Sequence, residues 1–297
     1  MEVRAVIQDL VFQQLINGFT IGMIYGTAAL GFTMVYKALG YLNFAHADNL
    51  MIGALLAYTC IVTLKFPLFV SFLVVIVLML LYGMCIERVL FRHFQRESKI
   101  TFMLVSISLS GILKNAALLI WGPEPRALPA IWGTGAIILN GVPFPIRNIY
   151  IMLIAITCLA LTSFFFAKTK IGLAMRIAAD DPEAAGLMGV RVSWTRVGTF
   201  SITAALGAIA GVLVAPLFNI TPELGSSLAL KAFIAAVVGG VGHIPGALIC
   251  GIFLGVGESL TAGFVSSGYR DAIIYAVGIM ILAFKPTGIF QKAYTKH

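Results

Sequence analysis

Apolar residues in this chain come in long runs, separated by short segments that carry charge, proline or glycine. A run of about 20 apolar residues can cross the hydrocarbon core of a bilayer as a helix. The pattern predicts runs at residues 10–36, 42–64, 67–90, 101–121, 148–167, 197–219, 228–242, 246–262 and 271–285. We therefore expect an all-α, polytopic transmembrane helical bundle with eight or nine spans, forming a single transmembrane domain over residues 1–297.

Two features inside the runs refine this expectation. Glycines recur at every fourth position, as at Gly18, Gly22 and Gly26 and again at Gly251 and Gly255. Such spacing lets helices pack closely in a membrane. The two short runs 228–242 and 246–262 are joined by a glycine-rich segment, residues 239–246, that is compatible either with a tight turn or with an interrupted, re-entrant element.

The composition agrees with a chain whose main solvent is lipid. Of its 297 residues, 60% are hydrophobic and 11% are charged, whereas a soluble domain has roughly a quarter charged residues. The four cysteines form no C-x-x-C pair, so neither a disulfide nor a metal site is indicated. The net charge of +8 is not gathered into one basic stripe, and we expect no nucleic-acid partner.

Lys and Arg are unevenly divided between the two sides of the predicted spans. Basic residues in short loops are retained on the cytoplasmic side. If loop 168–196 is cytoplasmic, thirteen of the 20 basic residues fall inside, and Lys114 lies within a span. The six outside are Arg4, Lys65, Arg126, Arg147, Lys231 and Arg270. This division predicts an amino end outside, a carboxyl end in the cytoplasm, and an extracytoplasmic loop at 122–147 whose many prolines and glycines indicate an ordered cap.

Loop 168–196 is expected to contain a short helix with well-defined ends. Asp181 is a suitable N-cap, Pro182 suits the first helical position, and Gly189 is a natural stop. A plain linker does not need caps, small residues and apolar residues together, so this pattern favours docking on a partner over a solvated connection. The residues of this expected docking helix are Asp180, Asp181, Pro182, Glu183, Ala184, Ala185, Leu187, Met188 and Gly189.

A polar cluster stands at the inner end of run 42–64. Its members are Asn43, His46, Asp48 and Asn49. A charged group near the bilayer centre costs roughly 2.5–3.5 kcal/mol on insertion scales, so such groups face protein or water. On a helix, His46, Asn49 and Gly53 share one face. That face either lines the inner gate of a pathway or forms a structural network with neighbouring spans, and the sequence leaves both open.

Two further charged residues lie within the runs. Glu258, near the outer end of run 246–262, is placed either to line a cavity or to pair with Arg270 across a short turn. Lys114 is close enough to the outer end of its run for its stem to reach the interface. The glycine-rich turn at 239–246 lacks the G-x-x-x-x-G-K-[ST] pattern, so no nucleotide site is expected in this chain.

Four segments together resemble the permease subunits of branched-chain amino acid ABC importers. They are the Asp-Pro-Glu-Ala-Ala segment with the glycine and valine that follow it (181–190), the Asn-Phe-Ala-His segment with its Met-x-Gly-Ala continuation (43–54), the Gly-Gly-x-Gly-x-x-Pro-Gly turn (239–246) and the closing Lys-Pro-Thr-Gly-Ile-Phe segment (285–290). Ala47 departs from the family, which usually has glycine there.

The resemblance implies a permease subunit of an ATP-driven importer in the bacterial inner membrane. Such a subunit forms half of the translocation pathway for branched-chain or related amino acids and is not itself an enzyme. Its short cytoplasmic helix is the coupling helix that enters an ATPase subunit. The implied partners are a second permease subunit, identical or homologous, two ATPase subunits that bind ATP and Mg²⁺, and an extracytoplasmic substrate-binding protein. No cofactor is expected on this chain. Candidate pathway residues are Asn43, Phe44, His46, Asp48, Asn49, Gly53, Gly239, Gly240, Gly242 and Glu258.

A self-contained secondary transporter driven by an ion gradient is the alternative. It would be expected to carry acidic residues near mid-membrane, often on broken helices, whereas Asp48 and Glu258 lie near the ends of their runs. An intramembrane enzyme is less consistent with the sequence, because the chain has neither a G-x-S-x-G elbow nor paired carboxylates in one run.

Overall fold

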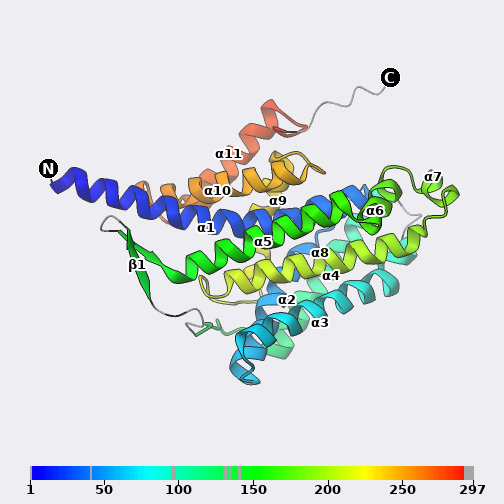
Figure 1. Ribbon diagram of the computed structural model, residues 1–297, viewed down its shortest axis with the longest axis horizontal. Helices are drawn as coiled ribbons and strands as arrows, with labels where there is room; N and C mark the ends of the chain where they lie inside the picture. The colour runs from blue at the N-terminus through cyan, green and yellow to red at the C-terminus, as the bar shows by residue number, and fades with distance from the viewer. Residues whose placement is uncertain are drawn as a thin grey trace.

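The computed structural model describes residues 2–40, 42–94, 98–129, 133, 135–139 and 142–290. Each of the predicted apolar runs contains a helix, and together they form an elongated bundle (Figure 1). These helices are α1 (Glu2–Leu39), α2 (His46–Tyr58), α3 (Leu68–Val89), α4 (Lys99–Trp121), α5 (Ile146–Lys168), α8 (Val192–Val214), α9 (Leu224–Val238), α10 (Ile244–Phe264) and α11 (Arg270–Phe284). The first helix starts well before the predicted run at residue 10.

Helix length separates two groups. Six helices, α1, α3, α4, α5, α8 and α10, are long and apolar enough to cross a membrane. The other three are shorter, with 13 residues in α2 and 15 each in α9 and α11. At a rise of 1.5 Å per residue, a 15-residue helix spans about 22 Å, less than a hydrocarbon core of about 30 Å. The predicted class of fold is confirmed, and the count of eight or nine spans is approximate.

Helices α1 and α10 cross closely through glycine. A Cβ atom added to Gly22 would lie 2.6 Å from the Cα atom of Ile252, and one added to Gly18 would lie 2.6 Å from that of Val256. On the facing side, Gly251 and Gly255 approach the backbone of Gly26 and Gly22. The predicted close packing is confirmed, because only hydrogen fits at these positions.

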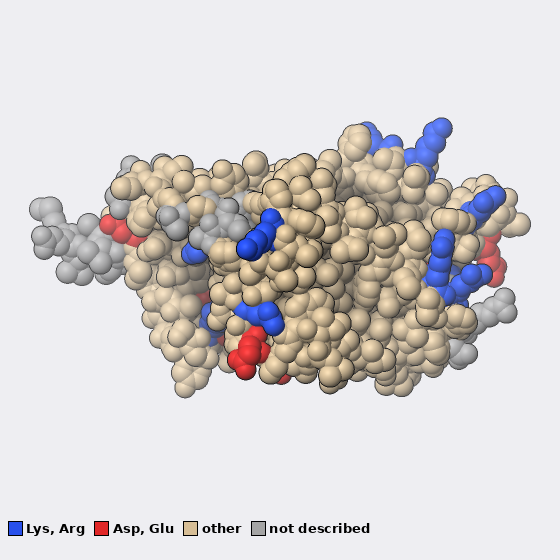
Figure 2. All heavy atoms as spheres, turned by 90° about the horizontal axis from the view of Figure 1, so that it is seen from below, with Lys and Arg blue, Asp and Glu red and all other residues tan. Residues whose placement is uncertain are grey.

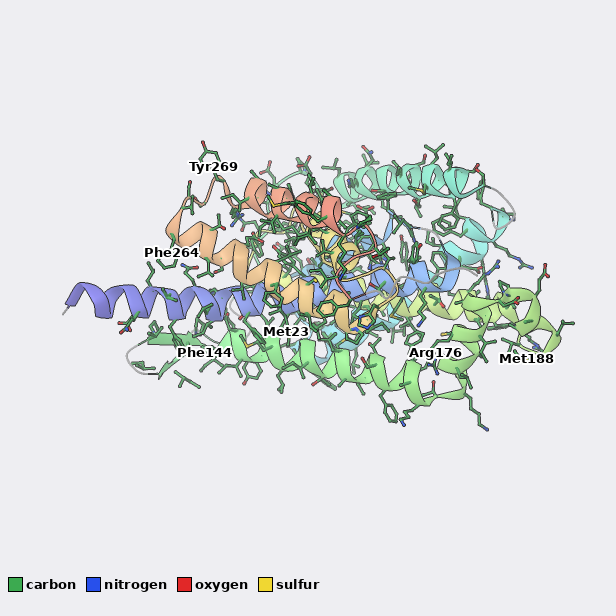
Figure 3. All side chains as sticks on the ribbon, turned by 90° about the horizontal axis from the view of Figure 1, so that it is seen from above. Met23, Phe144, Arg176, Met188, Phe264 and Tyr269 are labelled. Atoms are coloured by element: carbon green, nitrogen blue, oxygen red, sulfur yellow. The ribbon has the colours of Figure 1, made fainter. Side chains whose placement is uncertain are left out.

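The two ends of the bundle differ. Phe144, Phe264 and Tyr269 mark one end, here called the hairpin end, and Arg176 and Met188 mark the other, the α7 end (Figure 3). Lys and Arg side chains gather toward the α7 end, beside a wide stretch of surface without charge (Figure 2). Arg88 stacks 5.2 Å from the ring of Trp194 at this end. Basic residues that the sequence assigned to one side therefore do lie together.

The hairpin end contains the only strands in the described part of the chain. Strands β1 (Ala136–Leu139) and β2 (Val142–Pro145) pair antiparallel within the predicted loop 122–147. A backbone bridge joins Arg126 to Ile220, between α8 and α9. The sequence predicted an ordered cap here but no strands, so the hairpin is an addition to the all-α architecture.

Lys231 corrects the predicted division of charge. The sequence placed this residue in an outside segment, whereas it lies within α9 and is only 2% exposed. Lys231 lies inside the predicted run 228–242 but was counted with the outside residues because it is near the start of that run, whereas the helix begins earlier, at Leu224. What makes its burial possible is a set of acidic partners from other helices, described below.

Candidate functional site

The predicted short helix of loop 168–196 is present as α7 (Pro182–Leu187). The Asp181 carboxylate oxygen Oδ1 accepts hydrogen bonds from the backbone N–H groups of Glu183 (3.0 Å) and Ala184 (2.9 Å). Gly189 has φ +81°, a conformation that favours glycine. Both predicted ends of this helix are confirmed.

Helix α7 presents apolar side chains at the tip of the molecule. Leu187 is 91% exposed and Met188 is 61% exposed, and Met188 lies at the far end of the bundle (Figure 3). Ala185 is fully buried instead, because α7 packs against α6 and α8. Asp180 ends α6, and its side chain lies outside the described residues. The helix thus has one side fixed to the bundle and another side uncovered.

Helix α6 (Lys170–Asp180) is a second element, besides the β1–β2 hairpin, that the sequence analysis missed. Thr169 caps it, since its hydroxyl oxygen accepts a hydrogen bond from the N–H of Gly172 (3.0 Å). A Cβ atom at Gly172 would collide with the carbonyl oxygen of Phe165, so α6 turns back tightly from the end of α5. The threonine cap followed by glycine was the available signal for this helix. Through α6, the position of α7 is fixed relative to α5.

His46, Asn49 and Gly53 share one face of α2, as the spacing predicted. His46 Nε2 donates to the carbonyl oxygen of Ala28 (3.3 Å), and His46 Nδ1 accepts from the Asn49 side-chain amide (3.2 Å). A Cβ atom at Gly53 would overlap the backbone of Ala208 in α8. In this conformation the face forms a network that ties α2 to α1 and α8, which corresponds to the structural alternative that the sequence left open.

The remaining polar residues before and within α2 contact other helices. Asn43 Oδ1 accepts a hydrogen bond from the N–H of Ala45 (3.1 Å), and the N–H of Phe44 donates to the hydroxyl of Ser106 in α4 (3.2 Å). Asp48 is fully buried, and its two carboxylate oxygens make no hydrogen bond of good geometry in the described parts of the chain, although Ser110 and Lys114 of α4 act on this carboxylate. Asp48 is therefore the least compensated polar group of this cluster.

The glycine-rich segment at 239–246 is a tight turn between α9 and α10. Gly240 has φ +95°, and His243 Nδ1 accepts a hydrogen bond from the N–H of Gly246 (3.0 Å). A Cβ atom at Gly239 would overlap the backbone of Gly246, and Gly242 has φ +91°. Of the two alternatives from the sequence, the turn is the one observed.

The closing segment of the chain covers this turn. The N–H of Ile289 donates to the carbonyl oxygen of Val238 (2.7 Å). The ring of Phe290 stacks on His243, with 6.0 Å between ring centroids and an angle of 7° between planes. Two of the segments that carry the resemblance, distant in sequence, are thus in direct contact.

Glu258, which is buried, forms the centre of a charged cluster. Its carboxylate accepts hydrogen bonds from the Tyr25 hydroxyl (2.7 Å) and the Lys231 ammonium (2.6 Å). Lys231 also lies 2.8 Å from an oxygen of Asp271, and Arg270 Nε lies 3.7 Å from Glu258. Both predicted roles of Glu258 hold in part, because it lies near Arg270 and also lines a cavity at the hairpin end. Its closest charged partner, Lys231, was not predicted.

A family model described as "Branched-chain amino acid transport system / permease component" matches residues 14–283. The chain belongs to this family. It is 34% identical over 293 residues to the high-affinity branched-chain amino acid transport system permease protein BraD of Pseudomonas aeruginosa, covering 94% of this chain and 95% of that protein. The corresponding protein LivH of Escherichia coli (strain K12) gives the same identity and coverage. A probable LivH of Methanocaldococcus jannaschii is 26% identical over 97% of this chain and 95% of that protein.

The family assignment confirms the resemblance drawn from the sequence. This permease carries the four matching segments in order, and the structure shows that two of them, the 239–246 turn and the closing segment, pack together. The chain is a transport subunit and not an enzyme. The relatives that it matches over nearly their whole length are permease proteins too. It is a membrane protein, and six of its described helices are long and apolar enough to cross a bilayer.

Proposed function

We propose that this permease is the membrane-spanning subunit of an ATP-driven importer for branched-chain amino acids or chemically related solutes. The support is its family and the names of relatives that align over 95% of their length. Two such subunits, identical or homologous, enclose the pathway. An extracytoplasmic protein delivers the solute, and two ATPase subunits bind ATP and Mg²⁺.

The exposed tip of α7 is the observation that carries the proposed coupling to ATP. Leu187 and Met188 project into solvent from a helix that is capped at Asp181 and anchored through Ala185. Exposed apolar residues on a rigid, capped helix are typical of a contact that a partner completes. A closing ATPase dimer moves α7, and α6 and α8 pass this motion to the bundle. The ATPase subunits favour whichever conformation of the bundle makes the better contacts with them, so a change in the ATPase dimer shifts the bundle between its conformations.

The same proposal fixes the orientation in the membrane. The α7 end, which gathers basic side chains, is cytoplasmic. The carboxyl end is then on the cytoplasmic side and the amino end outside, with the β1–β2 hairpin facing the delivering protein. If the chain were an ion-coupled secondary transporter, the uncovered side of α7 would have no role.

Charge reversal on α7 tests this function. Glu183→Arg places a positive charge at the positive end of the helix and on the proposed contact. We expect normal insertion into the membrane and loss of the ATPase subunit when the permease is purified from its native membrane in mild detergent. Glu124→Arg, an exposed reversal in loop 122–147, is the matched control and retains the ATPase.

The same purification discriminates between the two transporter classes. Stoichiometric ATPase subunits with the unsubstituted chain support the importer. Recovery of the chain alone, with uptake that persists without ATP and stops when the ion gradient is removed, would establish the secondary transporter instead.

A further inference from the structure

A cavity of about 250 Å³ opens at the hairpin end of the bundle. Its walls come from five places in the chain, namely α1, α5, the segment between α8 and α9, α10 and α11. Arg147 and Arg270, which line it, lie close in sequence to Phe144 and Tyr269, which mark this end in Figure 3. The cavity is therefore at the opposite end of the bundle from α7. Its volume is below the roughly 300–1,000 Å³ of sites for drug-sized ligands, so it suits a smaller solute.

One part of the wall is rich in groups that bind a carboxylate. Arg147 and Arg270 both line the cavity. The charged cluster contributes two negative charges, Glu258 and Asp271, and two positive charges, Lys231 and Arg270, of which Glu258 and Lys231 are buried and Asp271 and Arg270 are partly exposed. Arg147 adds a positive charge beyond this balance. Arginine is the residue best suited to bind a planar carboxylate through two parallel hydrogen bonds.

The side-chain amides of the cavity are oriented by their neighbours. Gln14 accepts a hydrogen bond from the hydroxyl of Ser259 through Oε1 (2.7 Å), and Asn17 accepts one from Asn148 through Oδ1 (3.2 Å). With their oxygens engaged in this way, the NH₂ groups of Gln14 and Asn17 keep hydrogen atoms to donate. The polar wall is therefore held in place before any solute arrives, which lowers the entropy cost of binding.

The other features of the cavity fit the rest of an amino acid. Glu258 is among the residues that line the cavity, and its carboxylate has lone pairs beyond the two hydrogen bonds it accepts, so it is able to accept a further bond from an ammonium group that reaches it. Ile21, Leu217 and Phe218 supply an apolar surface. Positive, negative and apolar groups thus surround one small space.

We infer that this cavity is a substrate subsite within the permease, which receives a zwitterionic aliphatic amino acid before the amino acid enters the pathway that the two permease subunits enclose. Arg147 and Arg270 bind its carboxylate, Glu258 binds its ammonium group, and the apolar wall covers its side chain. This inference rests on the proposed function and adds the place where the solute binds in this subunit.

Protection of a cysteine in the cavity tests the subsite. Ala262 lines the cavity with a small side chain, so Ala262→Cys introduces a thiol with little change in volume. The complete transporter with its partner subunits, in nanodiscs, is treated with a water-soluble maleimide, and the unsubstituted complex gives the background from native cysteines. We expect L-leucine to slow the labelling of the new thiol, and 4-methylpentanoate and isoamylamine, which each lack one charged group, to protect much less.

A second variant connects the protection to the proposed contacts. Arg147→Gln in the Ala262→Cys background removes an exposed charge and should raise the L-leucine concentration for half-protection about tenfold, the value expected for loss of one charge-assisted contact. Arg92→Gln, an exposed arginine outside the cavity, is the matched control and should leave the half-protection concentration unchanged.

The outcomes separate this inference from the proposed function. If the unsubstituted transporter takes up L-leucine with ATP but L-leucine does not protect the thiol, the subsite is wrong and the importer stands. Equal protection by 4-methylpentanoate would make the cavity a general anion site and would also overturn the inference. A transporter that moves no aliphatic amino acid, with its ATPase and binding protein present, would refute the proposed function itself.

Discussion

The Lys231 ammonium lies 2.6 Å from Oε1 of Glu258, and both residues are 2% exposed. These residues belong to different helices, α9 and α10, and the Tyr25 hydroxyl of α1 donates a second hydrogen bond to the same carboxylate. Such an ion pair inside an apolar bundle exists only because each charge compensates the other. The pair fixes three helices relative to one another next to the cavity at the hairpin end.

Removing one member of this pair should be more harmful than removing both. Lys231→Met leaves Glu258 buried with only the more distant Arg270 as a cation, and we expect a loss of about 3–5 kcal/mol. The double variant Lys231→Met with Glu258→Gln should recover much of that loss. The stability of the single and double variants is compared by heating each in detergent and measuring the remaining folded protein by size-exclusion chromatography. Equal destabilisation in the single and double variants would show that the pair is not energetically coupled.

Methyl groups at two glycines should have opposite consequences. Gly22→Ala inserts a Cβ atom into the contact between α1 and α10 and should cost about 1–3 kcal/mol through overpacking. Gly111→Ala, in α4, is the control, because nothing lies within 4 Å of the added atom, and it should leave stability unchanged or slightly higher. The thermal midpoints of the two purified variants provide the comparison, and similar midpoints would contradict the close crossing.

The cap of α7 offers a graded test. Asp181→Ala removes the acceptor for two backbone N–H groups and should destabilise this helix by about 0.5–2 kcal/mol. Asp181→Asn keeps an oxygen in the same place and should retain most of the helix. Hydrogen exchange at residues 183–188 reports the difference directly. If the alanine and asparagine variants exchange at the same rate, the side-chain cap does not hold α7.

Neutralising Asp48 should stabilise the protein. Its buried carboxylate makes no hydrogen bond of good geometry among the described residues, and Ser110 and Lys114 of α4 compensate it only in part, so Asp48→Asn removes a charge while keeping the shape and should raise the thermal midpoint slightly. Asp271→Asn, which removes a partner of Lys231, is the contrasting control and should lower stability. Uptake by the Asp48→Asn variant tests the gate role: unchanged uptake would support a structural role for this cluster. A lower midpoint would contradict the prediction of stability.

The sequence by itself determined the class of fold and the elements with a local cause. Apolar runs produce helices in a lipid solvent because each helix satisfies its own backbone hydrogen bonds there, so composition and run length were sufficient. The cap at Asp181 and the stop at Gly189 were equally predictable, since a cap involves residues only a few positions apart. The resemblance carried by segments 43–54, 181–190 and 239–246 led to the correct family for the same reason, because motifs are local strings.

Only the tertiary structure decided which distant residues meet. Lys231 was counted with the outside residues, and its burial could not be predicted because its acidic partners Glu258 and Asp271 lie on other helices. The burial of His46 against α1 and the covering of His243 by Phe290 have the same origin. The lipid solvent explains why each helix forms. The choice of neighbouring helices depends instead on close contacts such as that of Gly22 with Ile252, and these contacts exist only once the bundle has assembled.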